Sequence, residues 1–311
     1  MLILKTSDGK FQKSVVALGF FDGVHLGHQK LIECARSISL KESLPTLVYT
    51  FDKHPLEYLK PEFQITYIQT NDEKADKFNS LGIDIAVFEK FSDVMNLSPR
   101  EFVDEILVGR LNAHSVVCGF NFRFGKENSG DVDTLSSCLS QYGIKLYVIP
   151  PVCAEDEPIS SSRIRNLLLS GEIEKANILL DEPFSISGEV VHGKHIGETM
   201  GFPTANIKLR KFSPELPKGV YFTKTHMDDK TYISVTNIGT RPTVRDGQQE
   251  SVCETHIIDF HEDVYSKTIK VDFYKKHRDE TKFATLKELA EMLCEDVQAS
   301  RNYFQRKGSV N

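Results

Sequence analysis

Two histidines three residues apart lie in a glycine-rich segment near the start of the chain. The segment GFFDGVHLGH spans residues 19–28 and overlaps the end of the apolar run at 14–20. Glycines let the backbone turn tightly beside a phosphate, and the first N–H groups of a following helix favour anions. His25 and His28 can share one side of the first helical turn and donate hydrogen bonds to phosphate oxygens. The pattern predicts electrostatic and positional catalysis at a phosphate, with no covalent intermediate.

The other residues of this segment that we predict to bind phosphate or nucleotide are Gly19, Phe20, Asp22, Gly23 and Gly27. Two alternatives stay open for the histidines. They can be incidental to an ordinary strand–turn–helix, or they can bind a metal, although no third ligand stands out. The position between a strand and a helix favours the phosphate site, because open α/β sheets bind ligands there.

A second candidate phosphate clamp is the segment ISSSRIR at residues 159–165. Hydroxyl groups at a helix start, followed by an arginine, can hold the outer phosphates of a nucleotide. The candidate residues are Ser160, Ser161, Ser162 and Arg165. Taken alone, the segment is better explained as a polar helix cap followed by a solvated arginine.

The second half of the chain carries the segment GFPTAN at residues 201–206. On an extended strand, Thr204 and Asn206 point to the same side. A hydroxyl and an amide carbonyl are oxygen ligands of the kind that Mg²⁺ accepts beside nucleotide phosphates. An edge-strand turn is a plausible alternative when the segment is taken alone.

The elements that must position these residues differ between the two halves of the chain. Up to residue 182, strand patterns alternate with helical ones, which predicts a Rossmann-like, mostly parallel α/β sheet. The expected strands are 14–20, 46–51, 83–89, 115–120 and 145–151. After that, period-two segments predict an antiparallel six-stranded β-barrel, followed by a C-terminal helix with a capping box at 285–288. We therefore expect two domains, 1–182 and 183–311.

Composition narrows the classes of function. The chain has 311 residues, of which 40% are hydrophobic and 26% charged, as is typical of soluble globular proteins. A net charge of −6 argues against a nucleic-acid partner held by bulk electrostatics. No stretch is apolar enough for a signal peptide or a membrane span, and the six scattered cysteines form no CxxC pair. We expect a cytoplasmic protein with reduced cysteines; its oligomeric state, including weak homo-oligomers, stays open.

Together these motifs resemble those of the prokaryotic bifunctional riboflavin kinases/FMN adenylyltransferases. The segment at 19–28 is similar to the nucleotidylyltransferase motif in the form that this family uses. Further similar segments follow in order: TFDKHP (50–55), GFNFRFG (119–125), ISSSRIR (159–165), GFPTAN (201–206), GVY (219–221), NIGTRPT (237–243), ETHIIDF (254–260) and RDETKF (278–283). The resemblance covers the chain from about residue 14 to residue 297.

The resemblance implies two reactions. The second domain would phosphorylate riboflavin to FMN with ATP, and the first would adenylylate FMN with ATP to give FAD and pyrophosphate. Mg²⁺ is the implied cofactor, with Thr204 and Asn206 at the metal, and Glu254 is the implied general base for the ribityl 5′-hydroxyl. The other residues implied by the resemblance are Phe51, Asn121 and Arg278 for flavin, and Gly193 and Gly197 for nucleotide.

Two segments depart from the family pattern. The flap segment at 192–197 has fewer glycines and arginines than usual, and Ser266 stands at a usual glycine position. These departures leave an alternative open: a single-activity FMN adenylyltransferase with a flavin-binding, regulatory C-terminal domain. A non-enzymatic flavin-storage protein is a further alternative, but it would have no use for three phosphate-binding segments.

Overall fold

The computed structural model describes residues 1–4, 11–60, 62, 65–191, 201–208, 213–242, 249–260 and 262–308. By internal contacts the chain divides into two compact units, Met1–Ser161 and Ser162–Asn311. None of the helices in the described part of the chain combines the length and apolar character that crossing a membrane requires. Each unit is described by itself below.

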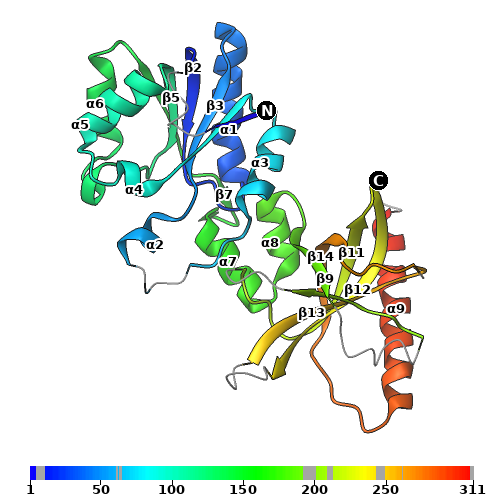
Figure 1. Cartoon of the computed structure of the whole chain (residues 1–311). Coiled ribbons are helices and arrows are strands. Elements are labelled where there is room, and N and C mark those ends of the chain that lie inside the picture. Colours follow the sequence, from blue (N-terminus) through cyan, green and yellow to red (C-terminus); the bar gives the residue numbers. More distant parts are fainter. Residues whose placement is uncertain are drawn as a thin grey trace. The chain divides into compact units, whose positions relative to one another are not determined.

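The first unit is built on a six-stranded sheet in the order β1-β4-β3-β2-β5-β6 (Figure 1). Every neighbouring pair in this sheet is parallel. The strands are β1 (Leu2–Leu4), β2 (Ser14–Leu18), β3 (Thr46–Phe51), β4 (Ile85–Glu89), β5 (Ala113–Gly119) and β6 (Lys145–Ile149). The predicted Rossmann-like sheet is confirmed, and β1 is an additional edge strand. Strands β3 and β4 extend the sheet on one side of β2, whereas β5 and β6 extend it on the other, so the strand order reverses between β2 and β5. Open α/β sheets bind their ligands at such a point.

Helices alternate with these strands, as the sequence predicts. They are α1 (Leu26–Glu42), α2 (Pro55–Leu59), α3 (Asn71–Ser80), α4 (Phe91–Val94), α5 (Pro99–Glu101), the π-helix η2 (Phe102–Arg110), the 3₁₀ turn η3 (Lys126–Asn128) and α6 (Val132–Ser140). Two-residue strands β7 (Cys153–Ala154) and β8 (Glu157–Pro158) form a separate pair. Capping boxes start α3 at Thr70 and α5 at Ser98. In each, the side chains of the N-cap and the third helical residue satisfy N–H groups that the helix leaves open.

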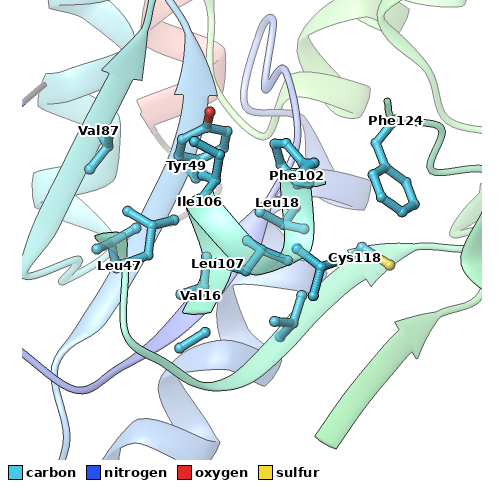
Figure 2. Close-up of a cluster of buried hydrophobic side chains, with 14 of the residues drawn as sticks. Val16, Leu18, Leu47, Tyr49, Val87, Phe102, Ile106, Leu107, Cys118 and Phe124 are labelled. Atoms are coloured by element: carbon cyan, nitrogen blue, oxygen red, sulfur yellow. The ribbon is translucent and has the colours of Figure 1, made fainter. Parts of the chain in front are cut away.

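The core of the first unit lies on both faces of the sheet. On β2, Val16 and Leu18 pack into one apolar cluster, whereas Val15 and Ala17 pack into the other. Figure 2 shows the first cluster, in which strand side chains meet Phe102, Ile106 and Leu107 of η2. Burial on both faces explains why the strands of a parallel sheet have nearly continuous apolar sequences.

The second unit contains a closed six-stranded barrel in the order β10-β13-β12-β11-β14-β9, with antiparallel pairing throughout. The strands are β9 (Phe184–Val191), β10 (Ala205–Lys208), β11 (Gly219–Met227), β12 (Lys230–Pro242), β13 (Gln249–Ile257) and β14 (Thr268–Arg278). The predicted barrel is confirmed. Its interior is partly polar, because Thr223, Ser234, Thr236 and Thr255 are fully buried and hydrogen-bond to one another.

In the described part of the second unit, the helices that accompany the barrel strands are α7 (Ser161–Ser170), α8 (Ile173–Leu180) and α9 (Leu286–Gly308). Asn177 of α8 donates to the carbonyl of Phe273 and accepts from the N–H of Phe184, both at 2.8 Å. This packing explains why contacts divide the chain after Ser161, the first residue of α7. Figure 1 shows α9 (red) alongside the barrel, where it contacts β11 and β12. The division of activities near residue 182 is a separate question and stays a prediction.

Candidate active sites in the two units

A pocket of about 320 Å³ opens at the carboxyl ends of β2, β3 and β5 in the first unit. This is the reversal point of the sheet, where the topology predicts a ligand. Of the residues that the sequence singled out, the pocket brings together Gly19, Phe20, His28, Phe51 and Asn121. Apolar rings dominate its wall, so the pocket suits a flat aromatic ligand beside a polar group.

The turn between β2 and α1 holds strained backbone. Phe21 has φ of 56° and Val24 has φ of 32°, in a region that side chains with a Cβ rarely adopt. Both side chains are fully buried, so the apolar core holds this turn in place. Strain of this kind concentrates at functional sites, because the surrounding structure must over-determine it. The finding agrees with a functional turn at this position.

The glycines in this turn are explained by different structural constraints. Gly23 has φ of 83°, the left-handed conformation that glycine adopts without steric cost. A Cβ at Gly27 would lie 3.1 Å from Cε1 of His25, and one at Gly19 would lie 3.0 Å from the ring of Phe21. Gly27 and Gly19 therefore leave room for neighbouring rings.

Asp22 fastens the turn to its surroundings. Its Oδ1 accepts hydrogen bonds from the N–H groups of Ile68 at 3.0 Å and Gln69 at 3.3 Å, ahead of α3. Its backbone carbonyl accepts a hydrogen bond from Oγ of Ser161 at 2.8 Å. Ser161, from the second predicted phosphate segment, is thus hydrogen-bonded to the first segment. The carboxylate of Asp22 is buried among backbone donors, so this geometry indicates a structural contribution.

His25 and His28 stack, with ring centroids 3.7 Å apart and 19° between the planes. His25 is the N-cap of α1, and its Nδ1 accepts the N–H of His28 at 3.4 Å. Burial lowers the pKa of His25 to about 4. Burial, followed by the nearby His25 and Lys74, also holds the pKa of His28 well below its usual value. Both rings are therefore neutral near pH 7, and Nδ1 of His28 is buried without a hydrogen-bond partner.

In the second unit a pocket of about 340 Å³ lies on the outer face of the barrel, under α9. The strand register places one row of residues across it. Asn206 pairs with Glu254, Glu254 with Asn237, Asn237 with Val220, and Val220 with Arg278. Side chains directly opposite in antiparallel strands share a face. The register thus gathers predicted residues that lie up to 72 positions apart in the sequence, from 206 to 278.

Glu254, Thr204 and Arg278 all line this pocket, and Asn206 is buried beside Glu254 in the register. His256 also lines it, whereas the intervening Thr255 points into the barrel. Neighbouring residues of this strand therefore lie on opposite faces of the barrel wall. Arg278 donates from Nε and Nη2 to the carboxylate of Asp296, at 2.9 and 2.7 Å.

The remaining predicted residues lie as follows. Ser160 is partly buried, and Nη1 of Arg165 lies 3.5 Å from Oγ of the exposed Ser162. Ser162 and Arg165 belong to the second unit by contacts. Gly193 and Gly197 fall outside the residues that the structure describes.

Comparison with known proteins matches each half of the chain to the family that its sequence motifs resemble. A family model described as FAD synthetase matches residues 8–163, and one described as riboflavin kinase matches residues 180–304. A bifunctional riboflavin kinase/FMN adenylyltransferase of Bacillus subtilis is 39% identical over 299 residues, covering 94% of this chain and 93% of that protein. This chain belongs to the bifunctional riboflavin kinase/FMN adenylyltransferase family. The resemblance seen in the sequence motifs is thereby confirmed.

Two further relatives support the match along the whole chain. The family member from Escherichia coli K12 is 35% identical over 293 residues, covering 93% of this chain and 92% of that protein. The crystal structure of a macrolide-efflux protein from Streptococcus pneumoniae has a TM-score of 0.88 at 30% identity, covering 97% of this chain and 99% of that one. The fold of both units is therefore found together in a solved structure.

The sequence analysis did not single out some residues that line the two pockets or lie beside them. Asn237 and Glu280 line the barrel pocket with Glu254, and a Cβ on Gly239 would lie 3.2 Å from Oε1 of Glu280 and 3.3 Å from Nδ2 of Asn237. The motif segments at 237–243 and 278–283 contain both residues, and that signal could have found them. Gly239 leaves room for these two polar groups beside the pocket.

Lys74 was also missed. It is 1% exposed on α3, and its Nζ lies 4.7 Å from the ring centroid of Phe20 and 5.5 Å from that of Phe88. Burial lowers its pKa to about 8, against the opposing effect of Asp22 and Asp52. A lysine in a polar helix gives no sequence signal of burial, because lysine is almost always exposed.

Acid should destabilise the first unit through His25. Its folded pKa of about 4 lies below the ordinary value of 6.5, so the unfolded chain binds more protons between these values. Stability from this residue is complete above about pH 6.5 and is lost as pH falls toward 4, a change on the order of 3 kcal/mol.

His25→Asn is the matched variant, since asparagine is a good N-cap and does not titrate. We expect the free energy of unfolding, measured in urea between about pH 7 and about pH 4.5, to fall less steeply for the variant. Equal slopes for both proteins would contradict a buried, neutral His25.

Proposed function

We propose that the chain makes FAD from riboflavin in two ATP-dependent steps, one in each pocket. Riboflavin is phosphorylated to FMN in the barrel pocket, and FMN is adenylylated to FAD in the pocket of the first unit. The observation that carries the proposal is the coincidence of motif and cavity: residues implied for each reaction line one pocket of the corresponding unit. The family match over both halves supports two activities rather than a single one.

In the adenylyl transfer, we assign FMN to the pocket that Phe51 and Asn121 line. An oxygen of the FMN phosphate attacks the α-phosphorus of ATP, and the bond to pyrophosphate breaks with its electron pair leaving on oxygen. His28 donates a hydrogen bond to a phosphate oxygen as this charge develops. Bound phosphate favours the protonated imidazole, so the triphosphate can restore the charge that burial withholds in its absence.

In the kinase reaction, Glu254 accepts the proton of the ribityl 5′-hydroxyl while that oxygen attacks the γ-phosphorus of ATP. An alcohol is a weak nucleophile until its proton has an acceptor in the transition state. Asn237 and Asn206 lie directly opposite Glu254 in the two neighbouring strands, so they can hold its carboxylate in one orientation. Arg278 lines the same pocket and is assigned to the flavin.

The donor set around the barrel pocket fits Mg²⁺. Thr204 lines the pocket, and Asn206 is 6% exposed with its amide nitrogen 3.4 Å from the carbonyl of Thr204. Mg²⁺ usually keeps several water and phosphate ligands, so few protein oxygens are needed to hold it. Mg²⁺ bound there would neutralise charge on the transferred phosphate.

We also propose a cytoplasmic protein whose partners are riboflavin, FMN, FAD and ATP, with no nucleic-acid or membrane partner. All six cysteines are free, in agreement with a reducing compartment. The net charge of −6 supports small-molecule substrates over nucleic acid.

A fragment of residues 1–182 tests how the activities divide. We expect it to convert FMN to FAD and to leave riboflavin unchanged, because the pocket with His28 lies entirely within the first unit. The measurement is chromatographic separation of flavins after incubation with ATP and Mg²⁺. The full chain, given riboflavin, should accumulate FMN and then FAD. A folded fragment that is inert on FMN would contradict the assignment of adenylyl transfer to this half.

A further inference from the structure

Helix α9 brings one buried carboxylate to the barrel pocket. Asp296 is 1% exposed and lines the pocket with the apolar side chains Leu289, Leu293 and Val297 of the same helix. Its two oxygens accept hydrogen bonds from Nε and Nη2 of Arg278, at 2.9 and 2.7 Å. This two-point ion pair fixes the plane of the guanidinium group as well as its position.

We propose that Asp296 is a positioning residue that orients Arg278 for the binding of riboflavin, an inference that rests on the proposed kinase function of this pocket. Arginine has five N–H donors, and Arg278 uses one on Nε and one on Nη2 for Asp296. A third, on Nη1, donates to the carbonyl of Asp279 at 3.2 Å. One N–H on each terminal nitrogen is left for a ligand in the pocket that Arg278 lines.

The backbone of Arg278 is fixed as tightly as its side chain. Arg278 pairs with Val220, and the register shifts directly after this pair. Gly219 has φ of 146°, and a Cβ there would lie 2.4 Å from the carbonyl oxygen of Arg278. Only glycine permits this approach of β11 to the end of β14. Backbone and guanidinium are thus both held before any ligand arrives.

The neighbouring His277 also lies close to Asp296 but does not supply its positive charge. His277 Nε2 lies 3.5 Å from Oδ1 of Asp296, and its ring stacks on Phe222 with centroids 4.5 Å apart. Burial lowers the pKa of His277, against the opposing effect of Asp296. Near neutral pH the ring is therefore neutral, and Arg278 is the cation that balances Asp296.

A purely structural role for Asp296 would be to dock α9 on the barrel. Other contacts of α9 serve that purpose away from the pocket. Ser300 donates to the carbonyl of Ser234 at 3.2 Å, and Arg301 pairs with Asp259 at 2.7 Å. These contacts supply a control that loosens the helix without touching Arg278.

The test measures riboflavin binding by fluorescence quenching, together with KM and kcat for FMN formation, on the full chain. For Asp296→Asn we expect the riboflavin Kd and KM to rise on the order of tenfold or more, because small misplacements of a positioning group cost that much. The kcat at saturating riboflavin and FAD formation from supplied FMN should stay within a few-fold of the parent.

A matched control removes a carboxylate away from the pocket and should leave Kd and KM unchanged. Asp259→Asn acts on the pair with Arg301. In the Arg278→Met background, adding Asp296→Asn should change riboflavin binding no further, since Asp296 acts through Arg278. If Asp296→Asn does not fold, Asp296→Glu keeps the charge but displaces the guanidinium, and it should raise KM with normal thermal stability.

Three results would overturn the proposal: an unchanged KM in folded Asp296→Asn, additive effects of the two changes, or an equal rise in KM for Asp259→Asn. A parent protein that forms no FMN would instead overturn the proposed kinase function. The binding measurement would still report on the ion pair in that case.

Discussion

Replacing Glu254 with glutamine is expected to lower FMN formation by about a hundred- to ten-thousandfold, the range that loss of a general base commonly causes. Riboflavin binding should stay within a few-fold of the parent. Glutamine keeps the size and planar shape of the side chain but has no basic oxygen pair. FMN formation from riboflavin, ATP and Mg²⁺ is the measured quantity, with binding followed by flavin fluorescence.

The geometry around Glu254 supports this selectivity. Asn206 and Asn237 flank it in the strand register, and amide side chains can hydrogen-bond to glutamine as well as to glutamate. The substituted residue should therefore keep its place. Thr255 on the opposite face is bonded within the barrel, so the strand itself has its own support.

Glu280→Gln is the matched control, because Glu280 is a second carboxylate lining the same pocket. It should reduce FMN formation far less than Glu254→Gln does. FAD formation from supplied FMN should be unchanged in both variants. Parental riboflavin phosphorylation by Glu254→Gln would contradict its role as base. Simultaneous loss of kinase activity, riboflavin binding and FAD synthesis would show that the residue maintains the structure instead.

Local patterns in the sequence predicted most of the fold. The strands β3 and β4 come within about two residues of their expected ranges, because burial periodicity acts over short distances. The capping box at Ser98 is present, but only a short α5 follows before the chain continues as the π-helix η2. Nothing in the local pattern distinguishes a π-helix from an α-helix, so the sequence could not predict it.

Ser266 and Leu286 show what the local sequence indicates about conformation and burial and what it does not. Ser266, at a usual glycine position, has φ of 61°, so the turn keeps the glycine conformation at some steric cost. Helical spacing puts Leu286 on the same face of α9 as Leu289 and Leu293, but Leu286 is 63% exposed, because it lies in the first turn of the helix, before the face that lines the pocket begins. The burial of a residue at a helix end depends on how far the surface that the helix packs against extends, and the local sequence does not contain this information.

The candidate sites depend more on contacts between distant residues. The motifs named Glu254 and Arg278, but only the strand register brings them to one pocket. The partner of Arg278, Asp296, lies 18 residues away on a helix, in a segment without a motif. An apolar helix face with one acidic residue is ambiguous in sequence, since the same pattern describes a solvated edge. Tertiary packing decides the outcome there.

His28→Ala should reduce FAD formation from FMN by on the order of a hundredfold or more, which is the usual effect of removing one donor from a developing negative charge. His28 lines the pocket of the first unit, and its buried Nδ1 has no partner within the protein. An unpartnered polar atom in a buried position is costly, which agrees with the proposed contact between His28 and a phosphate group. Rate constants for FAD formation at saturating FMN and ATP measure the effect.

Internal controls separate catalysis from folding in this variant. Alanine also removes the stack on His25 and the contact with Phe21, so thermal unfolding must be compared with the parent. FMN formation in the barrel should be unchanged, since that pocket belongs to the other unit. His28→Gln, which retains an N–H donor, should recover part of the lost rate. A folded His28→Ala protein that makes FAD at the parental rate would reduce the histidine pair to a scaffold, because its stacking and capping would then be its whole contribution.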